Sequence, residues 1–187
     1  ASEPGPLRRR HDGVTHAPHA DRARGPGAPS SAITVRAATQ RDLPIVLALR
    51  LALLHEHVAS PIYGRLRPDA ESRGRSLFSA QLESPREVTL LAERDGDVVG
   101  ILRCIESVGM PLLYPSRYGY VSSVYVRPEA RRSGVVRALL GEAEAWCAAR
   151  GLAELRLHSV AENVVANATW DALGFEVVEH LRVRHLP

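Results

Sequence analysis

The spacing of hydrophobic residues becomes regular at about residue 32 and stays so along the rest of the chain. Runs of β-branched residues at period two predict strands, and apolar residues at i, i+3 and i+4 predict helices. The resulting order is strand, helix, helix, three strands, helix, strand, helix and strand. This order predicts an α/β protein of the α+β type, in which a mixed sheet carries helices on both faces. The expected strands are 32–38, a hairpin within 86–107, 120–126, 152–160 and 175–186, and the expected helices are 40–58, 68–82, 135–150 and 163–173.

Local signals mark several of these boundaries. Thr39 with Asp42 is typical of a capping box at the start of the first helix. Asp95-Gly96 stands between two β-rich runs and is a strong signal for a tight hairpin turn. Gly74 is expected to weaken the second helix, because glycine in a helix interior is destabilising.

Residues 1–30 differ from the rest, because they are rich in Pro, Gly, Ala, Arg and His and show no hydrophobic period. Such a segment buries too little apolar surface to offset its ordering entropy, so we expect a disordered tail before a domain over 32–187. Its histidines could bind a metal weakly, although an incidental tail is the favoured interpretation, and a transit peptide is a further alternative. No apolar run follows Arg8–Arg10, so a secretory signal is not expected.

The composition is ordinary for a globular domain and narrows the classes of partner. All 24 basic residues are arginine, and five of them lie in residues 1–30 beside only three acidic residues. Most of the net charge of +3 therefore belongs to the tail, and a nucleic-acid surface on the domain is not expected. No run is long enough to cross a bilayer. Cys104 and Cys147 fall in separate elements, which predicts a reducing, cytoplasmic location with neither a disulfide framework nor a cysteine metal cluster.

The segment Val121–Leu140 predicts a strand, a short basic turn and the most regular helix of the chain. The first N–H groups of a helix have no internal acceptor, and the helix dipole adds positive potential, so such a turn can hold an anion. Arg131 and Arg132 would add mobile positive charge. Ser133 would add a hydroxyl, and Gly134 would allow a close approach or a positive φ. A solvated basic turn that only caps a core helix is an equally open interpretation at this point. The apolar face of the helix is formed by Val135, Val136, Leu139, Leu140, Ala143, Trp146 and Cys147.

Two blocks of this region resemble the acetyl-CoA-binding motifs of the GNAT N-acetyltransferase superfamily. The first motif is usually (Arg/Gln)-x-x-Gly-x-(Gly/Ala) after a strand that ends hydrophobic-aromatic-Val-x-Pro. Arg131, Gly134 and the strand end Val124–Pro128 fit it. The second is usually Asn-x-x-Ala-x-x-x-Tyr-x-x-Leu-Gly-Phe, and residues 163–175 fit it except that Trp170 stands at the tyrosine position. Two motifs at the family's separation are more specific than either alone, and the order of elements agrees over residues 32–187.

The resemblance implies a GNAT fold, whose mostly antiparallel sheet splays between the strands at 120–126 and 152–160 to admit the pantetheine arm of acetyl-CoA. It also implies direct attack of an amine on the thioester, without a covalent acyl-enzyme. A backbone N–H of Val124–Val126 would polarise the thioester carbonyl and stabilise the developing oxyanion. Asn163 would bind the pantetheine arm or its backbone contacts. The expected cofactor-binding residues are Val124, Tyr125, Val126, Arg131, Arg132, Ser133, Gly134, Val135, Val136, Asn163 and Trp170.

Two positions depart from the family pattern. Val136 stands where the family has Gly or Ala and would crowd the pyrophosphate, unless its side chain joins the apolar helix face and leaves its N–H available. We expect weaker or slightly displaced cofactor binding rather than none. Trp170 replaces the tyrosine that commonly protonates the leaving thiolate, and an indole is no acid, so a packing role beside the pantetheine is favoured. A thiol of pKa about 8.5 costs roughly 2 kcal/mol to leave as the thiolate at pH 7, which slows the reaction without abolishing it.

The residues that would move protons are not singled out by spacing. Many family members carry a carboxylate on the strand that here has Ser122 and Ser123. An alkyl amine of pKa about 10.4 costs roughly 4–5 kcal/mol to deprotonate at pH 7, whereas an α-amine of pKa about 7.7–8.0 needs little help. Water or a hydroxyl of Ser122, Ser123 or Tyr125 could protonate the sulfur. The candidate bases are Glu56, His55, His57, Glu106 and His158, and the first choices for catalytic roles are Tyr125, Ser122, Ser123 and Glu56.

We therefore expect an acetyl-CoA-dependent N-acetyltransferase that acts on a primary amine of a small molecule or peptide. The alternative is a catalytically impaired acyl-CoA-binding sensor or scaffold, and amine-dependent release of free thiol separates the two. The first two helices and the loop 108–119 would form the acceptor side, with Tyr63, Tyr114, Tyr118 and Arg117 as its walls. Homodimers are frequent in the family, so a homodimer is a further expectation. Neither nucleic acid nor a membrane is an expected partner.

Overall fold

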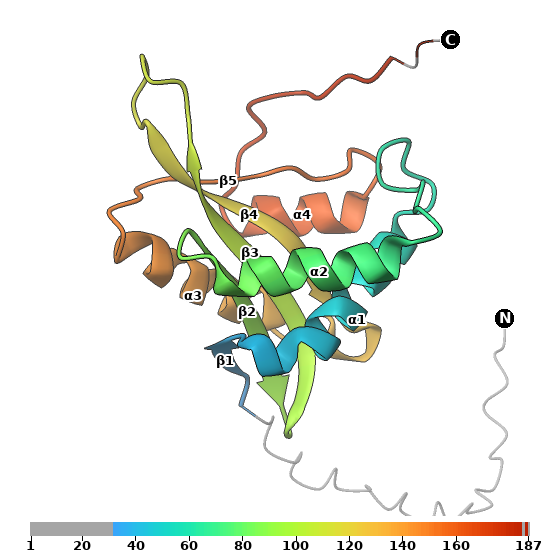
Figure 1. Cartoon of the computed structure of the whole chain (residues 1–187). Helices are drawn as coiled ribbons and strands as arrows, with labels where there is room; N and C mark the ends of the chain where they lie inside the picture. The colour runs from blue at the N-terminus through green and yellow to red at the C-terminus, as the bar shows by residue number, and fades with distance from the viewer. Residues whose placement is uncertain (1–31, 185, 187) are drawn as a thin grey trace, which may run out of the picture. The chain divides into compact units, whose positions relative to one another are not determined.

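A computed structural model describes residues 32–184 and 186, and Figure 1 shows its elements around a central sheet. Five strands follow the order β1-β2-β3-β4-β5, in which β1 to β4 are antiparallel neighbours and β4 and β5 run parallel. This is the mixed, mostly antiparallel sheet that the sequence predicts. The expected tail over 1–30 lies outside the described residues. The strands are β1 (Thr34–Ala37), β2 (Glu87–Arg94), β3 (Asp97–Val108), β4 (Arg117–Val126) and β5 (Leu155–Leu157), the helices are α1 (Leu43–Glu56), α2 (Ala70–Glu83), α3 (Val135–Ala148) and α4 (Val164–Ala172), and the 3-10 turns are η1 (Gln40–Asp42) and η2 (Pro128–Ala130).

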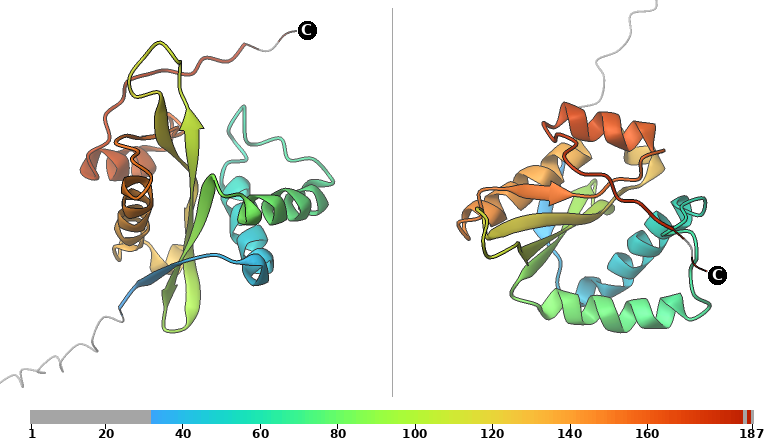
Figure 2. Two further views of the ribbon diagram at one scale, coloured as in Figure 1. Left: turned by 60° about the vertical axis from the view of Figure 1, so that its left-hand side comes forward. Right: turned by 90° about the horizontal axis from the view of Figure 1, so that it is seen from above.

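Helices cover both faces of the sheet, as predicted. Figure 2 shows α1 and α2 on one face and α3 with α4 on the other. Each face buries its own apolar cluster, because strand side chains alternate between the two sides. None of the helices in residues 32–184 has the length and hydrophobicity that a membrane crossing requires. The α3-side cluster includes Leu102, Cys104, Val121, Val135, Leu139, Ala143 and Cys147, and the α1–α2 cluster consists of Val46, Leu47, Leu49, Phe78, Leu91 and Ile101.

The capping box that the sequence predicts is formed at the start of the first helix. The Thr39 N–H donates to the Asp42 carboxylate at 2.8 Å. The same carboxylate pairs with Arg36 of β1 at 2.8 Å, so the helix start is tied to the sheet. The helical segment opens with η1 and ends at Glu56, two residues earlier than the pattern predicts.

Gly74 has a packing role in α2 that its propensity does not reveal. The helix runs through it without interruption, and a Cβ there would lie 3.0 Å from Leu47 Cδ1 and 3.3 Å from the Phe78 ring. The missing side chain therefore lets α1 approach α2 closely. Its helix propensity alone indicates only a weak point, because propensity ignores the neighbouring helix.

The hairpin between β2 and β3 confirms the turn signal in the sequence. Asp95 and Gly96 have φ values of 56° and 87°, so both residues adopt the left-handed conformation of a tight hairpin turn. The two strands pair from Glu87 with Ile105 to Arg94 with Asp97, with one irregularity beside Ala92 and Glu93. This long ladder supports the neighbouring β4.

The prediction of a final strand over 175–186 is wrong for the described residues, and β5 is shorter than predicted. β5 covers Leu155–Leu157 where the sequence predicts a strand over 152–160, and residues 175–184 form no strand. Val177 and Val178 of that segment are 76% and 84% exposed. Alternation indicates which face a strand would bury, but a strand also needs a neighbour for its backbone hydrogen bonds. No strand in residues 32–174 supplies one.

Candidate active site

The edge of β4 that faces β5 is paired over only part of its length. Residues 119–121 lie opposite 155–157 of β5, whereas β4 continues to Val126. Within residues 32–184, no strand pairs with 122–126 on that side. The ladder between these two strands therefore ends early, and a stretch of β4 backbone is left with an open edge.

A β-bulge in β4 marks the point where the ladder with β5 ends. Ser122 lies opposite Arg103 of β3 and Tyr125 lies opposite Ile101, so β4 has one residue more than β3 between these pairs. Ser123 has a φ of 53°, a left-handed conformation that residues other than glycine adopt rarely. The hydroxyl oxygens of the two serines are 3.1 Å apart. Both expected serines thus lie in the bulge, beside the open edge.

The bulge also determines what the open edge presents. The Arg127 N–H donates to the Val99 carbonyl of β3 at 2.9 Å. Backbone groups alternate between the two edges of a strand, so those of Val124 and Val126 face the open edge. The backbone groups of Tyr125 face β3, and its side chain packs against the α1–α2 cluster. An N–H of the expected strand end is therefore available on the side away from β3.

The turn between β4 and α3 presents a row of backbone N–H groups. Arg132 and Gly134 adopt φ values of 58° and 88°, and the Ser133 hydroxyl donates to a carbonyl of η2 at 2.7 Å. The first hydrogen bond of the helix runs from the Ala138 N–H to the Gly134 carbonyl at 3.0 Å. Among the described residues, no protein acceptor is found for the N–H groups of 132–137. These groups are the unpaired donors that the sequence predicts at a helix start.

The guanidinium of Arg131 is a fixed part of the turn rather than the mobile charge that the sequence suggests. Its Nε donates to the Val126 carbonyl at 3.0 Å, and its Nη2 pairs with Glu56 at the end of α1. It also lies 5.8 Å from the centroid of the Tyr125 ring. Glu56, an expected base, therefore has its carboxylate engaged in an ion pair. The pair joins the turn to the end of the first helix.

The two residues that depart from the motif pattern both pack against apolar neighbours. Val136 is half-buried against the α3-side cluster, and its N–H belongs to the row at the helix start. Its side chain therefore turns inward, as predicted. Trp170 meets Phe175 edge-on, with ring centroids 5.6 Å apart. This contact agrees with the packing role that the sequence favours for Trp170.

Asn163 caps α4, and a second asparagine holds the loop before it. The Asn163 Oδ1 accepts from the Ala166 N–H at 3.0 Å. The Asn167 Nδ2 donates to the Ala161 carbonyl at 3.0 Å, and its Oδ1 accepts from the Ser159 hydroxyl. Asn167 thus fixes the connection that follows β5. Its partners lie six and eight residues earlier in the chain, and no motif in the sequence indicates this role.

Tyr120 and His158 meet on the α1–α2 face, where the β4–β5 ladder ends. The Tyr120 Oη lies 2.8 Å from the His158 Nδ1. Gly119 and Val121 point to the α3-side cluster, so Tyr120 points the other way. Burial raises the pKa of the Tyr120 phenol. His158 is among the bases that the sequence suggests. Tyr120 is not, because local sequence does not reveal a partner 38 positions away.

The other expected bases are distributed over both faces. Glu106 shares its face of β3 with Cys104, on the α3 side, and pairs there with Arg117 at 3.3 Å. His57 lies beside Tyr63 just after α1, with ring centroids 6.0 Å apart. The sheet therefore separates Glu106 from the acceptor side that the sequence predicts.

Two of the four expected walls reach that acceptor side. Tyr118 shares the face of Tyr120, and Arg156 of β5 lies over the Tyr118 ring at 4.0 Å. Tyr114 is fully exposed in the β3–β4 connection. Tyr63 and Tyr118 are therefore on the α1–α2 side, and Tyr114 and Arg117 are not.

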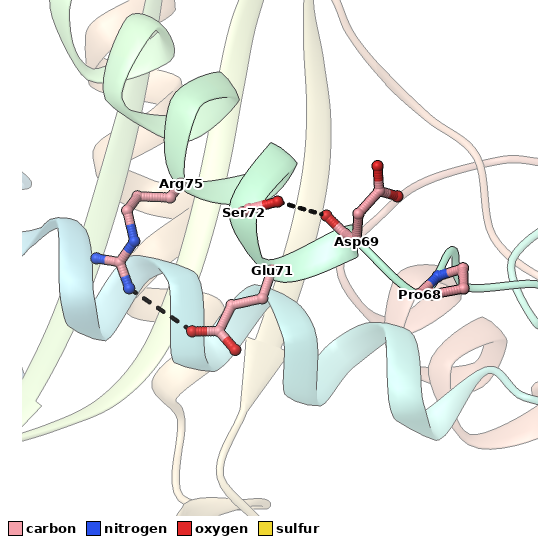
Figure 3. A pocket seen from close by; sticks show the side chains of 5 residues that line it. All are labelled: Pro68, Asp69, Glu71, Ser72 and Arg75. Atoms are coloured by element: carbon pink, nitrogen blue, oxygen red, sulfur yellow. Dashed lines mark hydrogen bonds and ion pairs between the residues drawn. The ribbon is translucent and has the colours of Figure 1, made fainter.

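A surface cavity of about 310 Å³ lies elsewhere, at the start of α2. Figure 3 shows the Arg75–Glu71 ion pair, at 3.6 Å, and the hydrogen bond from the Ser72 hydroxyl to the Asp69 carbonyl, at 3.1 Å. These polar groups satisfy one another, and none is a nucleophile beside a base. We therefore assign no catalytic role to this cavity. Its lining residues are Pro68, Asp69, Glu71, Ser72 and Arg75.

Comparisons with known proteins relate the chain to one family. The profile of the acetyltransferase (GNAT) family matches residues 52–175. An aminoglycoside N(6')-acetyltransferase type 1 from Stenotrophomonas maltophilia is 31% identical over 159 residues, which cover 84% of this chain and 95% of that protein. The match therefore extends over nearly the whole length of the relative.

Solved structures share the fold at lower sequence identity. A predicted acetyltransferase from Clostridium acetobutylicum, determined with acetyl-CoA, has a TM-score of 0.68 at 18% identity and covers 82% of this chain and 96% of its own. An aminoglycoside 6'-N-acetyltransferase from Acinetobacter baumannii has a TM-score of 0.68 at 21% identity and covers 83% and 99%. At these identities the likeness concerns the fold alone.

Proposed function

Because the chain belongs to the acetyltransferase (GNAT) family, we propose that the turn before α3 and the open edge of β4 bind acetyl-CoA, while an amine reaches the acetyl group from the α1–α2 face. The membership confirms the enzyme class that the two motifs predict, an N-acetyltransferase with acetyl-CoA as its acetyl donor. The roles of the individual residues are our proposal.

The row of N–H groups over residues 132–137 is the observation that supports the proposal most. A diphosphate carries negative charge, and a helix start offers both unpaired donors and the positive end of the dipole. A Cβ added at Gly134 would meet no atom within 4 Å, so this part of the turn is open to a ligand. Because the donors belong to the backbone, Val136 can contribute its N–H while its side chain stays in the core.

We propose that the pantetheine arm follows the open edge of β4 over Val124–Val126. When bound, acetyl-CoA supplies a thioester carbonyl and a sulfur leaving group. The edge N–H of Val124 would donate to that carbonyl, in the role that the motif implies. Asn163 and Trp170 would border the arm from α4, the first as the helix cap and the second as an apolar surface. Arg131 would serve by fixing the turn through its pair with Glu56.

The acceptor we propose is a primary amine on a small polar molecule, and amino sugars are the first class to test. The support is the 31% identical relative, which is named for aminoglycoside N(6')-acetylation and is covered almost completely. Tyr63 and Tyr118 would form walls on this side, where aromatic rings can stack on a sugar or hold a cation. A peptide amine is the second class.

Amine-dependent thiol release tests the proposal directly. The purified chain is mixed with acetyl-CoA and a panel of aminoglycosides, small amines and peptides, free thiol is followed with a disulfide reagent, and the acetylated amine is identified by mass spectrometry. Calorimetry measures acetyl-CoA binding in parallel. Release that depends on one class of amine supports the enzyme. Tight binding without release would instead support the acyl-CoA sensor.

We further propose a homodimer and a cytoplasmic location. The segment 175–184 and the β3–β4 connection expose apolar side chains that a second copy could cover. Light scattering of the purified chain would measure its mass and contradict the dimer if only monomer were found. The buried Cys104 and Cys147 are free thiols that share a hydrogen bond, with sulfurs 3.6 Å apart, which suits a reducing compartment. The exposed side chains are Val108, Met110, Leu112, Leu113, Val177, Val178, Leu181 and Val183.

A further inference from the structure

Tyr120 and His158 form a hydroxyl–imidazole pair at the point where β4 and β5 part. Tyr120 stands opposite Arg156 in the parallel ladder, and His158 directly follows Leu157, the last paired residue of β5. The Oη–Nδ1 distance is 2.8 Å, and the ring centroids are 5.6 Å apart at an interplanar angle of 58°. The bulge begins two residues beyond Tyr120, at Ser122. The pair thus lies between the open edge and the acceptor side.

The Tyr120 hydroxyl carries a proton that this pair can share. Burial raises the pKa of the Tyr120 phenol, with smaller contributions from neighbouring tyrosines, so the phenol keeps its proton at neutral pH. The phenol can therefore donate to the His158 Nδ1 in the imidazole tautomer that carries its proton on Nε2. The charged and titratable groups around the pair are Tyr63 from the α1–α2 connection, Tyr118 on β4, Arg103 on β3, and Arg156, which pairs with Glu154 at 2.5 Å.

The other candidate bases lack this position. Glu56 is held by Arg131, and Glu106 lies on the opposite face of the sheet. Among the described residues, neither His55 nor His57 has a side-chain hydrogen bond. His158 is therefore the one expected base that is held beside the end of the β4–β5 ladder. Histidine is also the side chain that most often acts as a general acid or base in enzymes.

Building on the function proposed above, we propose that Tyr120 and His158 form the proton relay of acetyl transfer, in place of both the β4 carboxylate and the α4 tyrosine of the motif pattern. The lone pair of the amine nitrogen forms the bond to the acetyl carbon, and the carbon–sulfur bond breaks with its electron pair left on sulfur. The proton lost by nitrogen goes to the Tyr120 oxygen as the phenol proton passes to His158 Nδ1. The imidazolium returns that proton through the phenol to sulfur, so the pair ends unchanged.

Three single variants separate this relay from a structural role. Tyr120→Phe removes the bridging hydroxyl, and His158→Gln removes the proton acceptor. Tyr114→Phe is the control, because it removes a tyrosine hydroxyl from a fully exposed side chain of the β3–β4 connection. We expect kcat to fall at least about 100-fold in the first two variants, as for loss of a general base, and to stay near wild type in the control. Acetyl-CoA affinity, measured by calorimetry, should be unchanged in all three.

The pH profile and the imidazole spectrum provide readouts that a structural role would not move. In wild type, kcat/KM should rise with pH as the general base loses its proton, and His158→Gln should lose this step. In protein labelled with ¹⁵N-histidine, the signal missing from His158→Gln identifies the ring, and its Nδ1 should appear as the unprotonated acceptor. Tyr120→Phe should mix the two tautomers.

The results distinguish failure of the proton relay from failure of the proposed acetyltransferase activity. Thiol release by wild type together with near-normal Tyr120→Phe and His158→Gln variants would overturn the relay and leave the acetyltransferase standing. A fall in kcat without loss of the pH step, or a protonated Nδ1 in the neutral wild-type ring, would also overturn it. No thiol release by wild type with any amine would refute both proposals. If a variant fails to fold, the wild-type spectrum and pH profile still decide.

Discussion

Replacing Gly134 by alanine isolates the contribution of the turn before α3 to acetyl-CoA binding. Gly134 has a φ of 88°, and Gly96 in the β2–β3 turn has a φ of 87°. A Cβ at either position would meet no atom within 4 Å. The two substitutions therefore impose the same backbone strain without a steric clash. They differ in where the added methyl group points, because only Gly134 lies in the row of N–H groups.

The expected loss of stability follows from the backbone alone. The left-handed conformation costs an L-residue about 1–2 kcal/mol. Alanine recovers about 0.4–1 kcal/mol by restricting the unfolded chain. Both Gly134→Ala and Gly96→Ala should therefore lower the free energy of unfolding by roughly 1 kcal/mol, measured by urea denaturation. The free energies of the two variants should agree closely.

Acetyl-CoA affinity should separate the two variants. The methyl group at position 134 would occupy space that the diphosphate needs, so we expect at least a tenfold weaker Kd, about 1.4 kcal/mol, in Gly134→Ala. Gly96→Ala should bind acetyl-CoA like wild type in the same calorimetry experiment. Equal affinities in the two variants would refute the assignment of the turn as the anion site. A weaker Kd in both would mean that loss of stability, and not position, governs binding.

Three further predictions concern packing, pH and thiol reactivity. Gly119→Ala should destabilise by about 1–3 kcal/mol in urea, because its Cβ would lie 2.5 Å from a cysteine sulfur, whereas Gly141→Ala, with open space in α3, should stabilise by up to about 1 kcal/mol. The Arg36 guanidinium holds the pKa of the Asp42 carboxyl well below its usual range. Asp42→Asn should therefore cost about 1 kcal/mol at neutral pH, and the difference from wild type in urea denaturation should shrink as the pH falls below about 4, where the unfolded carboxylate takes up a proton. Burial raises the pKa of both thiols, so iodoacetamide should leave the native chain unmodified at pH 8 and label both cysteines in urea.

The elements that local chemistry specifies could be predicted from the sequence. Thr39 and Asp42 form their cap, and Asp95-Gly96 forms its turn, because these residues determine the backbone within a few positions. The N–H groups before α3 follow from the start of a regular helix after Gly134. The inward packing of Val136 follows from its place on the apolar face of that helix.

Pairing between distant segments could not be predicted in the same way. The segment 175–184 has the alternation of a strand, yet no neighbour in the described chain pairs with it. The sequence suggests that Arg131 is a mobile surface charge, but Arg131 forms an ion pair with Glu56, which lies 75 residues earlier. The sequence suggests that Gly74 weakens its helix, but a side chain there would crowd Leu47 of the neighbouring helix. In each case the deciding partner is remote in sequence, so local pattern gives the residue type and misses its role.

The end of the β4–β5 ladder offers a place for a proton acceptor in a chain without the expected carboxylate. A base is useful by its distance from the amine and its pKa, whichever strand carries it. Tyr120 lies in the last paired part of β4, and His158 directly follows the last paired residue of β5, so the two side chains meet there from two different strands. Serines at 122 and 123 therefore do not by themselves argue for a lost activity. In the relay that we propose, the Tyr120–His158 pair takes the role that a carboxylate on β4 has in the motif pattern.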